Sequence, residues 1–209
     1  MTAYQTVTLG MGCFWSPDAL FGHLPGVIRT SVGYAGGNTD QPTYRQMGDH
    51  TETVQIQFDP ETIPLEHLIE VFWNNHNPIN INDYKGRQYR SLLFYNDEQQ
   101  LEAINKVIAE RKERDQGEPA TEIAPYSCFF PAEDRHQKYY LKRYPDAIDK
   151  LSSLYPRHED LINTTLVARL NGLAKGYTSL ERIKNEIKQW KLNPDERSRL
   201  LELISGIRW

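Results

Sequence analysis

Cysteine is scarce in this chain. Only Cys13 and Cys128 occur among its 209 residues, which is too few for a disulfide framework and typical of proteins from a reducing compartment. The sequence also lacks any apolar run long enough to span a bilayer. Near the N-terminus no basic segment is followed by an apolar one, so we expect no signal peptide. These absences predict a cytoplasmic protein without membrane attachment.

An excess of positive charge is absent as well. Lys and Arg total 24 against 28 Asp and Glu, for a net charge of -4, and no basic stripe predicts nucleic-acid binding. The 6 histidines and 2 cysteines show none of the spacings of zinc sites, so we expect neither a metal nor another cofactor. The hydrophobic content of 39% is nevertheless that of an ordinary globular protein.

Strands and helices are predicted to alternate over most of the chain. Apolar residues alternate with glutamines over 54–58, as in a half-buried strand. Further strands are predicted over residues 7–9, 27–34, 91–95 and 121–126, and helices over 16–24, from 64, from 96 or 97 to near 117, and over 132–142. Because the strands at 27–34 and 54–58 are consecutive, the sheet should be mixed, and we expect an α+β two-layer sandwich.

The pattern changes after Pro145, where no further strand is predicted. Leu166, Leu170 and Leu173 recur at helical spacing, and residues 193–196 read as a capping box with proline in the first helical position. We therefore expect two parts, a catalytic domain over residues 1–150 and an all-helical C-terminal extension over residues 151–209.

Cys13 lies where a predicted strand gives way to a predicted helix. The segment Ser16-Pro17-Asp18 is typical of a helix start, with Ser16 as the N-cap. Free backbone N–H groups and the helix dipole would stabilise a thiolate there, so we expect a lowered pKa and a nucleophilic sulfur. The alternative is an inert core cysteine. The glycines at 10 and 12 and the aromatic pair that follows favour the reactive residue.

Two further features suit chemistry at Cys13. Adjacent aromatics such as Phe14 and Trp15 are commonly core residues. Beside a thiolate they favour a pocket for a polarisable group that gains positive character, such as the methyl of a protonated sulfoxide. Glu52 has the same parity as the apolar residues of strand 54–58, so its carboxyl should point to the buried face, have a raised pKa and serve as a general acid. The alternative is a solvated glutamate at a strand end.

Six short segments occur in a distinctive order over about residues 5–143. They are Gly10-Met-Gly-Cys-Phe-Trp15, Val32-Gly-Tyr-Ala-Gly-Gly37, Pro42-Thr-Tyr44, Gln88-Tyr-Arg-Ser91, Thr121-Glu-Ile123, and Ala132-Glu-Asp134 with His136-Gln137. In order and spacing they closely resemble the peptide methionine sulfoxide reductase A family. The resemblance implies that Cys13 is the nucleophile, that Phe14 and Trp15 enclose the substrate methyl, and that Glu52 is the proton donor.

The same resemblance assigns three more residues. Tyr44 and Tyr89 match hydroxyls that bind the sulfoxide oxygen. Asp83 matches a loop aspartate of the family, although the segment from Asp83 to Tyr89 is one residue longer than the family pattern. Many family members also carry resolving cysteines in a C-terminal tail, whereas no cysteine follows Cys128 here. We expect Cys128 to be structural.

The function implied by the resemblance is the reduction of methionine S-sulfoxide, free or in proteins and peptides, through a sulfenic acid at Cys13. This reaction repairs oxidative damage and needs no cofactor or metal. Without a resolving cysteine, the reductant should be an external thiol such as thioredoxin, glutaredoxin or glutathione. We expect a monomer.

Two other functions would use some of the same residues. A papain-like hydrolase would also carry a cysteine before an aromatic, with His136 or His158 downstream, but position 7 is valine where that family has glutamine. A module that binds oxidised or Met-rich segments without turnover would use the same pocket.

Overall fold

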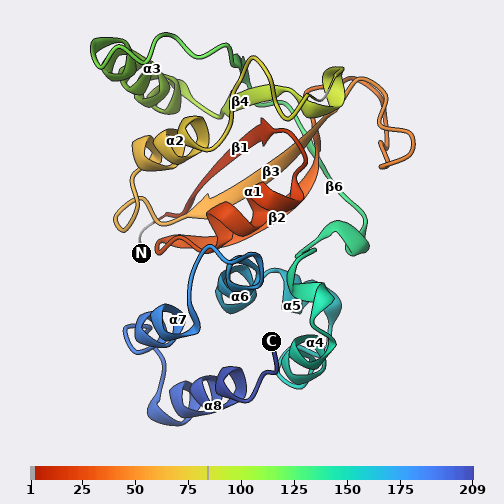
Figure 1. Ribbon diagram of the computed structural model, residues 1–209, viewed down its shortest axis with the longest axis vertical. Helices are drawn as coiled ribbons and strands as arrows, with labels where there is room; N and C mark the ends of the chain where they lie inside the picture. The colour runs from red at the N-terminus through yellow and green to blue at the C-terminus, as the bar shows by residue number, and fades with distance from the viewer. Residues whose placement is uncertain (1–2, 84) are drawn as a thin grey trace.

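The centre of the molecule is a six-stranded sheet (Figure 1). The computed structural model describes residues 3–83 and 85–209. In spatial order the strands are β5 (Glu122–Pro125), β4 (Ser91–Tyr95), β1 (Gln5–Met11), β3 (Thr51–Phe58), β2 (Val27–Ala35) and β6 (Phe129–Pro131). Only the β4–β5 pair is parallel among these neighbours. The predicted mixed sheet and α+β class are therefore confirmed.

Three helices pack on one face of the sheet, α1 (Trp15–Gly22), α2 (Leu65–Asn74) and α3 (Glu98–Glu113). The alternation in β1 and β3 explains the core beneath them, because every second residue of a strand points to the same face. Val7 and Leu9 of β1 lie against Ile56 and Val54 of β3, and all four are at most 1% exposed. Asp97 caps α3 by accepting a hydrogen bond from the Gln100 amide, which decides between the two starts, 96 and 97, that the sequence left open.

The opposite face of the sheet is covered by the chain itself. The short segment over residues 126–128 joins the two edge strands, β5 and β6. Tyr126 and Phe129 pack there against Ala35, Leu92 and Phe94.

Two predicted helix features are wrong. Residues 132–142 form two single 3-10 turns, η2 (Asp134–His136) and η3 (Leu141–Arg143), with Lys138 in the left-handed region at φ 53°. The long-range hydrogen bonds of Gln137 and Lys138 hold this segment in its irregular course. The helix predicted to start after Ser16 begins at Trp15, and its N-cap Phe14 makes no side-chain cap.

The C-terminal part consists of helices, and no strand is found beyond residue 131 in the described chain. They are α4 (Pro145–Ser152), α5 (His158–Ile162), α6 (Thr165–Lys175), α7 (Leu180–Ile187) and α8 (Pro194–Ser205). The predicted capping box of α8 is present. These helices form a second apolar core, which also includes Leu141. The division at residue 150 falls inside α4 and stays a prediction.

Helix α6 packs directly against α1 (Figure 1). A Cβ added to Gly22 would lie 2.9 Å from the carbonyl oxygen of Ala168, and one added to Gly172 would lie 2.4 Å from the Cβ of His23. The two glycines therefore permit the close approach. Arg169 of α6 donates a hydrogen bond to the Gly22 carbonyl at the end of α1 and makes a bidentate ion pair with Glu186.

A buried ion pair at the first turn of α1 joins α1 to β2, to α6 and to the segment that contains Lys138. The Lys138 Nζ lies 2.7 Å from Oδ1 of Asp18, and both side chains are 0% exposed. Thr30 of β2 donates to Asp18 and accepts from the Lys138 ammonium, while Asn171 of α6 donates to the second Asp18 oxygen. Every charged oxygen and the ammonium thus have partners, as burial requires.

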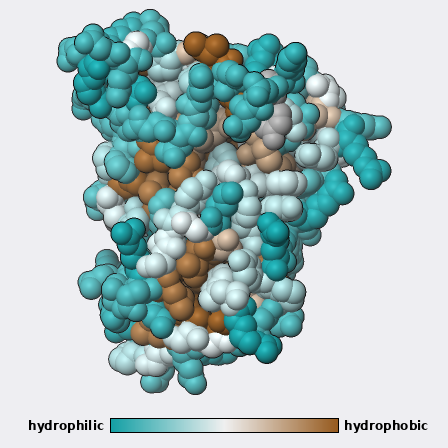
Figure 2. Space-filling view, in the orientation of Figure 1, coloured by the Kyte–Doolittle hydropathy of each residue, from teal (hydrophilic) through white to brown (hydrophobic). Residues whose placement is uncertain are grey.

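The surface on the face of Figure 2 is mainly hydrophilic, with apolar side chains showing in a few separate patches. No helix in the described chain combines the length and apolar character needed to cross a membrane.

Replacement of Lys138 by methionine should lower the free energy of unfolding by about 3–5 kcal/mol, because Asp18 would remain as an unpaired buried charge. Urea unfolding followed by circular dichroism measures this loss. The matched control is Lys106→Met, whose ion pair with Glu66 is exposed and should be worth about 1 kcal/mol or less. Equal losses in the two variants would contradict the importance of the buried pair.

Candidate active site

Cys13 lies between the end of β1 and the start of α1. Gly12 has φ 91°, a left-handed conformation that suits glycine and turns the chain from the strand into the helix. Leu9 pairs with Val54 in the antiparallel register of β1 and β3, so the C-terminal end of β1 meets the start of β3. That register brings Glu52 beside the segment that carries Cys13.

Glu52 is a buried carboxyl with two defined partners. Its side chain accepts hydrogen bonds from the Phe14 amide at 3.1 Å and from the Gln88 side chain at 2.7 Å, and the residue is 1% exposed. Burial raises the pKa of Glu52, and the two hydrogen bonds oppose that shift only in part. The orientation and the raised pKa predicted from strand parity are both found.

The pKa of Cys13 differs from the expectation. Burial raises it, the Coulomb interaction with Glu52 raises it further, and the Trp15 amide lowers it by hydrogen bonding. The predicted lowering of the Cys13 pKa is therefore wrong. The first turn of α1 does donate to the sulfur, but desolvation beside a carboxylate outweighs that effect.

Phe14 and Trp15 have different surroundings. Phe14 is 1% exposed and lies in the main core. The Trp15 indole is half-buried and stacks on Tyr139, with ring centroids 3.8 Å apart and planes 3° from parallel. Its N–H donates to Nδ1 of His136 at 3.2 Å. The stacking and the hydrogen bond fix the indole beside Cys13.

Two tyrosine hydroxyls meet next to Glu52. Tyr44 and Tyr89 are hydrogen-bonded to each other, and the Gln88 amide donates to the Tyr89 hydroxyl at 3.0 Å as well as to Glu52. Burial and the charge of Glu52 raise the pKa of both tyrosines, so their hydroxyls remain protonated donors. Cys13 also contributes to these shifts, which places all four groups in one electrostatic cluster.

Asp83 lies elsewhere in the site region. It is exposed, has φ 59°, and exchanges hydrogen bonds with the side chain of Asn80 in the same turn. The structure thus places it in the loop rather than against Glu52 or the tyrosines. Its catalytic role stays a prediction, and Tyr84 in the same segment lies outside the described residues.

Several residues of the site received no role from the sequence. Gln88 bridges Glu52 and Tyr89, His136 accepts from Trp15, and Glu133 accepts hydrogen bonds from the Tyr34 hydroxyl and the Tyr44 amide. All three belong to the six segments that resemble the family, so the resemblance marks these positions without assigning them a role. Tyr139 carried none, because its contact with Trp15 depends on the irregular course of residues 132–142.

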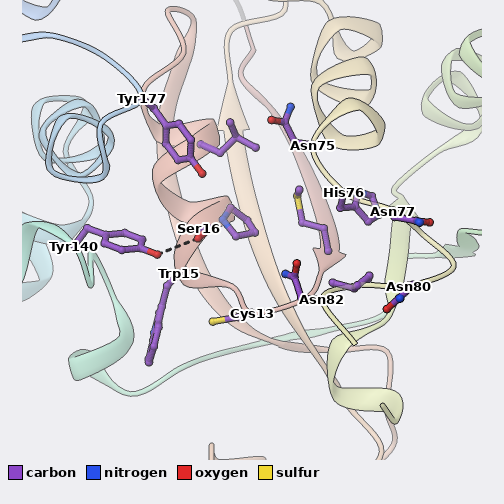
Figure 3. Close-up of a pocket in the computed structure, with 14 residues that line it drawn as sticks. Cys13, Trp15, Ser16, Asn75, His76, Asn77, Asn80, Asn82, Tyr140 and Tyr177 are labelled. Atoms are coloured by element: carbon purple, nitrogen blue, oxygen red, sulfur yellow. Dashed lines mark hydrogen bonds between the residues drawn. The ribbon is translucent and has the colours of Figure 1, made fainter. Parts of the chain in front are cut away.

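A cavity of about 440 Å³ opens on the other side of Cys13 (Figure 3). Trp15, Ser16 and Leu20 of α1 form its floor, the loop over 75–82 forms one wall, and Tyr140 and Tyr177 form the other. The Ser16 and Tyr140 hydroxyls are hydrogen-bonded at 3.0 Å. In the described chain no three His, Cys, Asp or Glu side chains gather as metal ligands.

Fold and site together are typical of enzymes that work through a cysteine nucleophile with a neighbouring acid. The family model described as peptide methionine sulfoxide reductase matches residues 5–165. A peptide methionine sulfoxide reductase of Drosophila melanogaster is 44% identical over 194 residues, covering 92% of this chain and 77% of the relative. The chain belongs to the peptide methionine sulfoxide reductase family.

Other relatives agree. A peptide methionine sulfoxide reductase of Methanococcus maripaludis is 41% identical over 150 residues, covering 68% of this chain and 96% of the relative. The solved structure of Mxr1 from Saccharomyces cerevisiae in reduced form is 29% identical and superposes with a TM-score of 0.61, covering 68% of this chain and 86% of that chain.

The Glu52→Gln variant should lower the pKa of Cys13, because it removes the carboxylate charge that opposes thiolate formation. The ultraviolet absorbance of the thiolate, followed against pH in a Cys128→Ser background, measures the shift. Glu113→Gln changes an exposed carboxyl on α3 and serves as the control. An unshifted Cys13 pKa in Glu52→Gln, or a wild-type pKa below that of a free cysteine, would refute the electrostatic account.

Proposed function

We propose that this chain reduces methionine S-sulfoxide, free or in peptides and proteins, to methionine, with Cys13 as the nucleophile and Glu52 as the acid. The observation that carries the proposal is the hydrogen bond from the Phe14 amide to the buried Glu52 carboxyl. It holds the acid against the residue that follows the thiol. The choice of the S-epimer rests on family membership.

The reaction requires Cys13 as a thiolate beside Glu52 as a neutral acid. Burial raises the pKa of both groups, and the charge of Glu52 raises the pKa of Cys13 further. A bound sulfoxide favours the required arrangement, because its oxygen accepts hydrogen bonds from a protonated Glu52 and from the hydroxyls of Tyr44 and Tyr89.

The thiolate then attacks the sulfoxide sulfur while Glu52 donates its proton to the oxygen. The attack forms a bond between the two sulfur atoms. This bond and the S–O bond of the substrate then break as the hydroxyl passes to the Cys13 sulfur. Methionine leaves with its sulfur reduced by two electrons, and Cys13 is oxidised to the sulfenic acid. Phe14 and Trp15 supply the apolar and aromatic wall for the methyl group, whose sulfur carries positive character during the attack.

Recycling requires two external thiols. They reduce the sulfenic acid of Cys13 back to its thiol, and the products are a disulfide of the two external thiols and one water molecule. Cys128 lies between Tyr126 and Phe129, which pack on the face of the sheet opposite the helices, whereas Cys13 stands beside Glu52 and the start of α1. A disulfide needs Cα atoms within roughly 7 Å, and both cysteines are free, so Cys128 is not assigned to recycling. Thioredoxin, glutaredoxin and glutathione are the candidate reductants. A monomer in the cytoplasm that repairs oxidised proteins fits this chemistry.

Wild-type protein supplied with dithiothreitol should consume only the S form of a racemic methionine sulfoxide peptide, as resolved by chiral chromatography. Cys13→Ser should show no turnover with an unchanged circular dichroism spectrum, because the change removes the nucleophile and little volume. Consumption of the R form, or turnover by Cys13→Ser, would defeat the proposal. Peptide binding without any turnover by the wild type would instead indicate a binding module.

The Cys128→Ser variant should keep near-normal turnover with dithiothreitol and with thioredoxin, since external thiols rather than Cys128 reduce the sulfenic acid. One equivalent of substrate should leave the wild type with one free thiol and one sulfenic acid that reacts with dimedone. Detection of an intact Cys13–Cys128 disulfide by mass spectrometry, together with a variant that stalls with thioredoxin, would show that Cys128 resolves the intermediate.

A further inference from the structure

The cavity beside Cys13 has a larger volume than one side chain would fill. The methyl and oxygen of the sulfoxide belong on the Glu52 side of the sulfur, among Phe14, Tyr44 and Tyr89. The cavity lies on the other side, over Ser16 and Leu20 of α1, and its volume of about 440 Å³ exceeds that of a single residue. Cys13 and Trp15 border both regions. A substrate with its sulfoxide at Cys13 can therefore extend chain atoms into the cavity.

The lining of the cavity is polar and uncharged. No described residue in it is an Asp, Glu, Lys or Arg. Its one titratable imidazole, His76, has a pKa lowered by burial, and its Nε2 lies 2.7 Å from the Ser91 hydroxyl. A free amino acid brings an ammonium and a carboxylate, and glutathione brings two carboxylates, whereas no charged side chain lines this cavity. Neutral peptide groups match this lining.

One wall presents side-chain amides, which pair with peptide groups as both donor and acceptor. It contains Asn75, Asn77, Asn80 and Asn82. Asn80 is committed to Asp83 through both its oxygen and its nitrogen. The Asn82 side chain makes no hydrogen bond to any residue in the described ranges, and it stands at φ 53° on the cavity side of the loop.

The other wall is aromatic and comes partly from the C-terminal extension. Tyr177 follows α6, where Gly176 at φ 90° reverses the chain and the Tyr177 amide closes on the Gly172 carbonyl. Its ring stacks on His23 at the end of α1, with centroids 5.8 Å apart. Tyr140 is held by Ser16 and by Lys175, whose ammonium lies 4.6 Å from its ring centroid. The extension thus fixes both rings along one wall of the cavity, with Tyr177 at the end away from Cys13 (Figure 3).

We propose that this cavity is a subsite for the polypeptide that flanks the methionine sulfoxide, with Asn82 contacting its peptide groups and Tyr177 its side chains. Tyr177 is then a specificity residue supplied by the extension. It favours methionine sulfoxide within a chain over the free amino acid. The inference rests on the proposed reductase activity and adds to it where the rest of the substrate lies.

The test compares two neutral substrates with dithiothreitol as reductant. One is N-acetyl-methionine S-sulfoxide methylamide, and the other is an uncharged heptapeptide with the same residue at its centre. In Tyr177→Ala and Asn82→Leu, the ratio of kcat/KM for the heptapeptide to that for the amide should fall about tenfold, equivalent to about 1.4 kcal/mol. The change should lie in KM. Tyr177→Phe, which keeps the ring, should retain most of the ratio, and exposed Tyr4→Ala should leave it unchanged.

Three results would overturn the subsite. An unchanged ratio would show that the peptide does not use the cavity, and an equal loss for both substrates in correctly folded protein would show that Tyr177 only supports α1. A raised KM for thioredoxin with normal peptide kinetics would assign the cavity to the reductant. Failure of the wild type to reduce even the amide would refute the proposed function itself, which is a separate outcome.

Discussion

The ion pair between Asp18 and Lys138 governs how the parts of this molecule meet. Lys138, which contacts Asp18, has a left-handed backbone conformation. This conformation prevents residues 132–142 from forming one continuous helix. The interruption directs His136 and Tyr139 against Trp15. The second oxygen of the Asp18 carboxylate accepts a hydrogen bond from Asn171, which attaches α6 to α1. The position of the indole beside Cys13 is therefore a consequence of a charge buried one helical turn away.

Much of the fold follows from two local patterns in the sequence, the alternation of apolar and polar residues along strands and the capping residues at helix starts. The strands β1, β3 and β4 alternate or run apolar because they are central in the sheet, and Asp97 and Asn193 cap helices with their own side chains. The burial of Glu52 was also predictable, because parity along one strand decides it. Such features need no knowledge of distant residues.

The errors have a common origin in contacts between distant residues. Residues 132–142 have a helical pattern, but the hydrogen bonds of Lys138 to Asp18 and Thr30 span more than a hundred positions and outweigh local propensity. Ser16 looks like an N-cap, yet its hydroxyl is engaged with Tyr140. The Cys13 pKa was misjudged because the dipole of α1 is visible in sequence, whereas desolvation beside Glu52 is a property of the folded site.

The contact of α6 with α1 also bears on how the protein is made. Arg169 and the Gly22 carbonyl that it binds are separated by 147 positions, and α1 is among the first elements to leave the ribosome. During synthesis, α1 thus has its sheet partners long before its outer face is covered. The sheet and α1 can therefore assemble while the outer face of α1 is still open, and the contact between Arg169 and Gly22 forms only after α6 has been synthesised. Closure of this face is a late, long-range step that joins the two ends of the chain.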